Sequence, residues 1–98
     1  MNSSEKTYIK KYLSHGRVQG VGYRQFVHST ARKLALCGTV RNLPTGTVET
    51  LAYGPQSALN ELLQALKKGP PAAEVSTVTI TSDKQTTEKN WNDFTILY

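Results

Sequence analysis

The pattern of apolar and polar residues along the chain predicts five strands and two helices. In the first half, aromatic and branched residues favour a strand over 8–14, and apolar residues at helical spacing predict a helix over 23–36. Two β-prone segments, 39–43 and 47–53, flank the turn signal Leu43-Pro44-Thr45-Gly46. Strands on either side of a short Pro/Gly turn are typical of a hairpin.

The second half contains a strong amphipathic signal and two further strands. Four leucines at i, i+3, i+4 and i+7 predict a helix: Leu59, Leu62, Leu63 and Leu66. Gly69-Pro70-Pro71 ends this helix. Alternating Val and Thr predict a strand over 75–81, and residues 94–98 a last one. The polar segment between them, 82–93, is expected to be a loop.

The element order is therefore β-α-β-β-α-β with a short fifth strand. Right-handed crossovers place both helices on one face of an antiparallel sheet. We expect an α+β fold, the ferredoxin-like split βαβ sandwich (βαββαβ), with a four- to five-stranded sheet. The domain is expected over 6–98, after a flexible tail over 1–5, and Gly38 is expected to cap the first helix at its C-terminus. This fold hosts many functions and indicates no chemistry by itself.

Composition places the chain among small intracellular domains. Its 98 residues suit one domain, and no apolar run approaches the roughly 20 residues that span a membrane. The first six residues lack the apolar core of a signal peptide. The single Cys37 cannot form an internal disulfide, which favours a reducing compartment. We expect a cytoplasmic monomer without a membrane partner.

The net charge of +5 is unevenly distributed. Residues 1–42 hold eight Lys or Arg and one Glu, whereas residues 43–98 hold four Lys and six acids. A basic half can steer an anionic ligand, bind nucleic acid or simply keep the surface soluble. The charge alone does not choose among these three.

The segment Gly16–Arg24 joins the first strand to the first helix and contains three glycines. Glycine turns can direct successive N–H groups into one concavity that binds an anion, and the helix that follows adds its positive end. The guanidinium of Arg24 matches two oxygens of a phosphate or carboxylate. From the spacing alone, a phosphate site and a plain turn with one solvated arginine are equally open.

Two segments of the chain resemble the signature sequences of the acylphosphatase family. They are Gly16-Arg17-Val18-Gln19-Gly20-Val21-Gly22-Tyr23-Arg24 and Gly38-Thr39-Val40-Arg41-Asn42-Leu43-Pro44-Thr45-Gly46-Thr47-Val48, continuing to Gly54. Further landmarks are Gly69–Val75 and Phe94–Ile96. One position departs: Thr39 stands where the family usually has an aromatic residue beside the site. We expect looser packing or lower stability there rather than lost chemistry.

The resemblance implies hydrolysis of the carboxyl-phosphate bond of acyl phosphates, without metal or cofactor. It implies that Arg24 holds the phosphoryl oxygens and that Asn42 positions the attacking water. The backbone N–H groups that complete the phosphate cradle belong to Gln19, Gly20, Val21, Gly22, Tyr23 and Arg24. Inorganic phosphate is then both the product and a competitive inhibitor.

Two other function classes compete with this interpretation. An RNA-binding module shares the α/β order, but its Lys/Arg-Gly-Phe/Tyr run is absent from the sequence, so no nucleic-acid partner is expected. A regulatory domain that binds without turnover is disfavoured because both Arg24 and Asn42 are present. His15 and His28 are interpreted as structural or solvated residues, since they share no motif with a catalytic partner. Cys37 is interpreted as a packing residue, since the end of a helix disfavours a thiolate.

Overall fold

The computed structural model describes residues 6–87 and 92–98. Its elements are β1 (Thr7–Arg17), α1 (Tyr23–Lys33), β2 (Cys37–Asn42), β3 (Val48–Pro55), α2 (Gln56–Lys68), β4 (Glu74–Thr86) and β5 (Phe94–Leu97). The tail predicted over 1–5 lies outside the described residues. Neither described helix has the length and apolar character needed to cross a bilayer.

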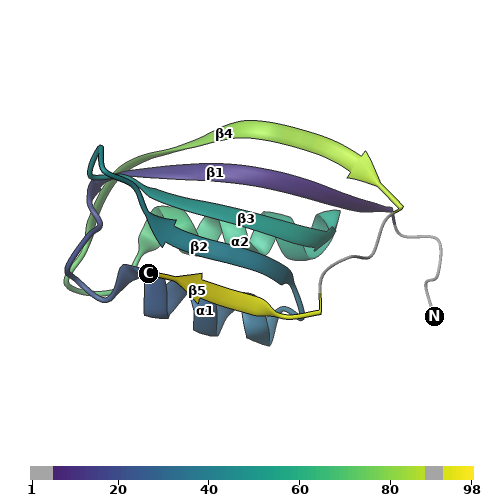
Figure 1. Cartoon of the computed structure of the whole chain (residues 1–98), viewed down its shortest axis with the longest axis horizontal. Coiled ribbons are helices and arrows are strands. Elements are labelled where there is room, and N and C mark those ends of the chain that lie inside the picture. Colours follow the sequence, from purple (N-terminus) through teal and green to yellow (C-terminus); the bar gives the residue numbers. More distant parts are fainter. Residues whose placement is uncertain (1–5, 88–91) are drawn as a thin grey trace.

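The five strands form one sheet in the order β4-β1-β3-β2-β5, as Figure 1 shows. Strand β1 pairs antiparallel with β3 and β4, and β3 pairs antiparallel with β2. Strand β5 runs parallel to β2, with Val40 opposite Ile96, so the sheet is mixed. The predicted ferredoxin-like split βαβ fold is confirmed with five strands, but the expectation of a wholly antiparallel sheet is wrong, because β5 joins the edge parallel to β2.

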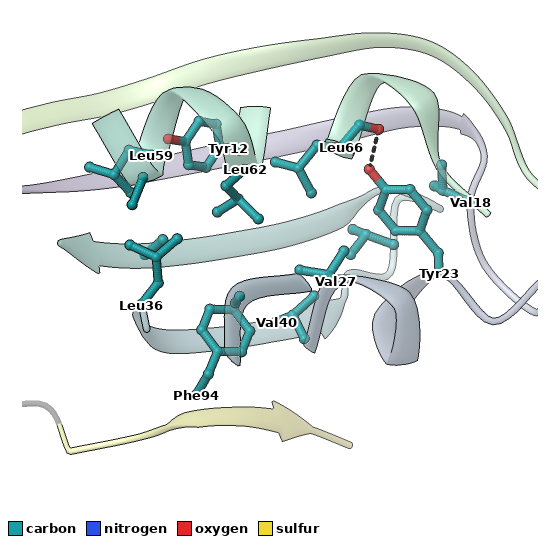
Figure 2. Close-up of a cluster of buried hydrophobic side chains, with 14 residues drawn as sticks. Tyr12, Val18, Tyr23, Val27, Leu36, Val40, Leu59, Leu62, Leu66 and Phe94 are labelled. Carbon is teal, nitrogen blue, oxygen red and sulfur yellow. Dashed lines mark hydrogen bonds between the residues drawn. The ribbon is translucent and has the colours of Figure 1, made fainter. Parts of the chain in front are cut away.

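Both helices cover the same face of the sheet, and one apolar core lies between the two layers (Figures 1 and 2). On α2, Leu59, Leu62 and Leu66 are fully buried as their spacing predicts, and Leu63 packs partly buried against them. On β3 the predicted alternation is confirmed from Val48 to Ala52, because Val48, Thr50 and Ala52 are all buried, but it ends at Tyr53, which is buried as well. The other face of the sheet is partly exposed, which matches the alternating burial along β1.

A buried tyrosine fixes the start of α1. Tyr23 is 1% exposed, and its hydroxyl donates to the carbonyl oxygen of Leu66 at 2.8 Å. The same hydroxyl is hydrogen-bonded to Ser14 Oγ at 2.7 Å. Figure 2 shows the bond that joins Tyr23 to the last turn of α2. The first residue of α1 is thereby tied both to α2 and to β1.

The expected cap at Gly38 is wrong. Helix α1 ends at Lys33, and the left-handed residue after it is Ala35, with φ 58°. Backbone bonds from Ala35 N to Arg32 O and from Leu36 N to Ala31 O close the helix end. Gly38 lies in β2 with φ 143°, where a Cβ would overlap the carbonyl of Leu51. Glycine is needed there for close strand contact, which sequence spacing does not reveal.

The loop expected over 82–93 is wrong in its first part. Strand β4 continues to Thr86, and Thr7 pairs with Thr86 at its far end. Residues 88–91 lie outside the described residues. The prediction failed because β4 is an edge strand that stays largely exposed at this end, so its residues are polar and show no apolar alternation.

Candidate active site

The loop between β1 and α1 makes two left-handed turns at glycine. Gly20 has φ 75° and Gly22, which is the N-cap of α1, has φ 80°. Outside their chain neighbours, no heavy atom of the described residues lies within 4 Å of a Cβ added at either position, so the backbone conformation and not crowding demands glycine. These turns leave both glycines exposed at the surface of the loop.

Backbone N–H groups at the start of α1 lack hydrogen-bond acceptors within the described residues. No side chain among the described residues caps the helix, and its first turn contains no acidic residue. Within residues 6–87 and 92–98, the N–H groups of residues 19–22 donate to no backbone carbonyl. The first N–H groups of any helix also lack intrahelical partners and carry its positive partial charge. Donors and charge together favour an anion at this position.

A cavity of about 140 Å³ opens at this end of α1. It is lined by Val18, Gly20, Gly22, Tyr23, Arg24, Gln25, Asn42, Ile96 and Tyr98. Among the described residues that line it, Arg24 is the one with a charged side chain. The cavity therefore combines a cation, polar groups and free backbone donors in a space that suits a small anion and water.

Arg24 reaches the cavity from the first turn of α1. Its Nη1 donates to the carbonyl oxygen of Leu97 at 3.2 Å, and its guanidinium carbon lies 4.8 Å from the centre of the Tyr98 ring. A guanidinium has five N–H donors, so one bond to Leu97 leaves the others for a ligand. The end of β5 thus holds the arginine without using up its hydrogen-bonding capacity.

Asn42, the last residue of β2, lines the same cavity. Its Oδ1 is buried and has no hydrogen-bond partner among the described residues. Buried polar atoms without a partner are uncommon in folded proteins. The side-chain amide of Asn42 is therefore not committed to the fold through this oxygen, and it can serve a small molecule in the cavity.

The residues predicted for the phosphate cradle divide into two groups. Gly20, Gly22, Tyr23 and Arg24 line the cavity, whereas Gln19 and Val21 are not among its lining residues. The Gln19 side chain points to the turn between β2 and β3, where its Nε2 donates to Leu43 O at 2.9 Å and to Thr47 O at 2.8 Å. The Tyr23 ring is buried in the core, so only its backbone is placed to bind a ligand.

Four lining residues were not predicted from the sequence: Val18, Gln25, Ile96 and Tyr98. Val18 and Gln25 flank the glycine loop, so their proximity was available from sequence position alone. Ile96 and Tyr98 come from the other end of the chain. Only the parallel pairing of β5 with β2 brings them beside Asn42, and no local pattern encodes that pairing.

The weaker sequence candidates lie outside the cavity lining. His15 Nε2 is 3.4 Å from Thr79 Oγ1, between β1 and β4, and the His28 ring lies 6.3 Å from that of Phe94. Thr39 pairs with Leu51 and Thr95 within the sheet. In the part of the chain that the structure describes, no three His, Cys, Asp or Glu side chains gather as metal ligands would.

Comparison with known proteins points to one family for this chain. The sequence model of the Acylphosphatase family matches residues 10–96. An acylphosphatase of Syntrophotalea carbinolica is 56% identical over 70 residues, which are 71% of this chain and 76% of that protein. An acylphosphatase of Bacillus subtilis is 41% identical over 88 residues, covering 90% and 94% of the two chains.

The fold agrees with these sequence matches. The crystal structure of acylphosphatase from Bacillus subtilis superposes with a TM-score of 0.87 at 37% identity, covering 93% of this chain and 99% of that one. Sequence and fold thus agree over nearly the whole length, and the matched range includes every cavity-lining residue except Tyr98. The chain belongs to the acylphosphatase family.

Proposed function

We propose that the cavity at the start of α1 binds the phosphoryl group of an acyl phosphate and that Asn42 positions the water that attacks it. The family gives the reaction: the chain is an acylphosphatase, a hydrolase of acyl phosphates. The observation that supports these site roles is the meeting of Arg24 and Asn42 in one cavity beside free backbone donors. Residues from two distant segments converge there on a space of suitable size.

The proposed chemistry needs little from the protein beyond binding and orientation. The water oxygen forms a bond to phosphorus, and the bond from phosphorus to the acyl oxygen breaks. The bonding pair leaves on a carboxylate, which departs without a proton, so no general acid is required. The proton from water passes to a phosphoryl oxygen of the substrate. Charge stays on the phosphoryl oxygens, where Arg24 and the N–H groups stabilise it.

Asn42 is proposed to orient the water and not to deprotonate it. A side-chain amide offers one acceptor oxygen and two N–H donors, and it does not titrate. Holding the water in line with the bond that breaks converts a bimolecular encounter into a positioned one. The amide is available for this role because its Oδ1 has no partner in the described fold.

We also propose that the reaction proceeds without a metal ion. Arg24 and the N–H groups at the start of α1 supply the positive charge that a divalent cation provides in other phosphoryl-transfer sites. We further propose a cytoplasmic monomer with inorganic phosphate as competitive inhibitor. The half-buried free thiol of Cys37 supports the reducing compartment.

Phosphate release from benzoyl phosphate, measured in excess chelator, tests this proposal. We expect full turnover without added metal and competitive inhibition by inorganic phosphate. Loss of activity in chelator that a divalent cation restores would contradict the metal-free site. Phosphate binding without any turnover would favour a regulatory domain instead.

A further inference from the structure

The side chain of Gln19 links the two segments that carry Arg24 and Asn42. Its Nε2 uses both hydrogens, one on Leu43 O at 2.9 Å and one on Thr47 O at 2.8 Å. Gln19 belongs to the loop before α1, while the two carbonyls belong to the turn between β2 and β3. The amide therefore joins segments that are 24 and 28 residues apart in the sequence.

The turn that Gln19 contacts begins directly after Asn42. The turn is already closed by its own backbone bonds, from Leu43 N to Thr47 O at 2.9 Å and from Gly46 N to Leu43 O at 3.0 Å. Both carbonyls that Gln19 contacts keep a backbone partner when its amide is removed. The amide is thus not needed to form the turn. What it adds is a fixed position of the turn relative to the loop.

That fixed position is important for Asn42 in particular. No hydrogen bond to its Oδ1 holds the side chain among the described residues. Its place in the cavity is then set by its backbone, at the end of β2 opposite Val48. A shift of this strand end relative to the loop would move the Asn42 amide relative to Arg24. Small displacements of positioning groups are costly in catalysis.

We propose that Gln19 is a positioning residue, which sets the placement of Asn42 relative to the phosphate-binding loop by hydrogen-bonding Leu43 and Thr47. This inference rests on the proposed function, because it requires Asn42 to orient water. It adds a side-chain role to the backbone N–H role expected for Gln19, because the side-chain amide contacts Leu43 and Thr47 and not the cavity. The loss of Gln19 should affect turnover through Asn42 and leave the cradle intact.

The first test is Gln19→Met, which keeps an unbranched side chain of similar length and removes both donors. We expect kcat for benzoyl phosphate to fall about ten- to a hundredfold, as for other displaced positioning groups. The inhibition constant of inorganic phosphate should stay within about twofold, the usual limit for uncoupled sites. Equal losses in kcat and in phosphate affinity would show that Gln19 shapes the cradle, and would overturn the inference.

The matched control is Gln56→Met, the same chemical change at the start of α2. This substitution also removes a glutamine hydrogen bond, from Nε2 to Asn60 Oδ1 at 3.0 Å. Neither Gln56 nor Asn60 lines the cavity. We expect it to retain wild-type kcat. A reduced kcat in Gln56→Met equal to that of Gln19→Met would attribute the effect to general destabilisation and overturn the positioning role.

The decisive test is the double variant Gln19→Met with Asn42→Ala. If Gln19 acts through Asn42, adding Gln19→Met to Asn42→Ala lowers kcat by no more than about twofold, because residues that act as one unit are not additive. Independent, multiplicative losses would overturn the inference. A normal kcat in Asn42→Ala alone would overturn the proposed function, whereas a low kcat there and a normal one in Gln19→Met would overturn only the role of Gln19.

A second substitution guards against misfolding. If Gln19→Met is unfolded at the assay temperature, Gln19→Asn replaces it, since its amide is one methylene too short to reach both carbonyls. The same separation of kcat from phosphate inhibition is expected. If both variants fail to fold while Gln56→Met folds, Gln19 is a requirement of the fold itself and the positioning role is overturned.

Discussion

The guanidinium of Arg24 lies against the Tyr98 ring, with its carbon 4.8 Å from the ring centre, while Nη1 donates to Leu97 O at 3.2 Å. An arginine near an aromatic face gains a cation–π attraction, and the backbone bond fixes one edge of its plane. The remaining donors can then meet two phosphoryl oxygens together. A lysine in the same place would offer a point charge without this fork.

We therefore predict that Arg24→Lys restores little of the activity that Arg24→Ala loses. Each variant should reduce kcat/KM for benzoyl phosphate by about 10²–10³, the usual loss when one electrostatic contact is removed. Steady-state kinetics and inhibition by inorganic phosphate provide the measurement, and thermal unfolding checks that both variants are folded. A near-normal rate in Arg24→Lys would show that charge alone is sufficient.

Turnover should vary little with pH between about 5 and 8, because arginine and an amide do not change protonation in that range. A histidine base would instead give kcat a steep limb within that range. Neither His15 nor His28 lines the cavity. We expect His15→Asn and His28→Asn to keep most of the wild-type kcat at every pH. A limb near pH 6.5 that disappears in one variant would assign proton transfer to that histidine.

The alkaline limit of stability should depend on Tyr12. Burial, and to a smaller extent the charge of Asp83, raises the pKa of Tyr12 from 10.0 to about 12. Between these values the unfolded chain has lost the tyrosine proton and the folded chain keeps it, so the unfolding free energy falls as the pH rises. Below pH 10 the contribution is fully present. Two pKa units correspond to about 2–3 kcal/mol.

Denaturant unfolding between pH 9 and 12 measures this effect. Tyr12→Phe should lose less stability over that range than the wild type does, and part of the fall should remain because burial also raises the pKa of Tyr23. Tyr98→Phe is the control, because it removes a hydroxyl from a residue that is 95% exposed. An unchanged alkaline fall in Tyr12→Phe would contradict the assignment to Tyr12.

Much of the fold could be predicted because local patterns and tertiary packing agree. The leucines of α2 and the alternation of β3 face the core as their spacing indicates. Prediction failed where a residue serves a contact that is remote in sequence. Gly38 was interpreted as a cap, but the approach of Leu51 is what requires it. Strand β4 extends over polar residues because an edge strand can remain exposed.

The candidate site was predictable for a different reason. Gly20, Gly22 and Arg24 lie within one short segment, so their spacing already places a loop before a helix start. The placement of Arg24 and Asn42 in one site was expected from family resemblance alone, since only the folded sheet brings the end of β2 to α1. The direction of the Gln19 side chain and the wall formed by Ile96 and Tyr98 depend on tertiary pairing. No periodic pattern in the sequence indicates either feature.

Asn42 is proposed to orient water in a cradle that binds phosphate without help from its amide. The most direct measurement is kcat for benzoyl phosphate together with the inhibition constant of inorganic phosphate in Asn42→Ala. We predict that kcat falls by about a hundredfold or more, as expected for a lost positioning group. Phosphate should still inhibit competitively, with nearly the wild-type constant. Loss of phosphate inhibition along with activity would contradict the account, because Asn42 would then belong to the binding site or to the fold.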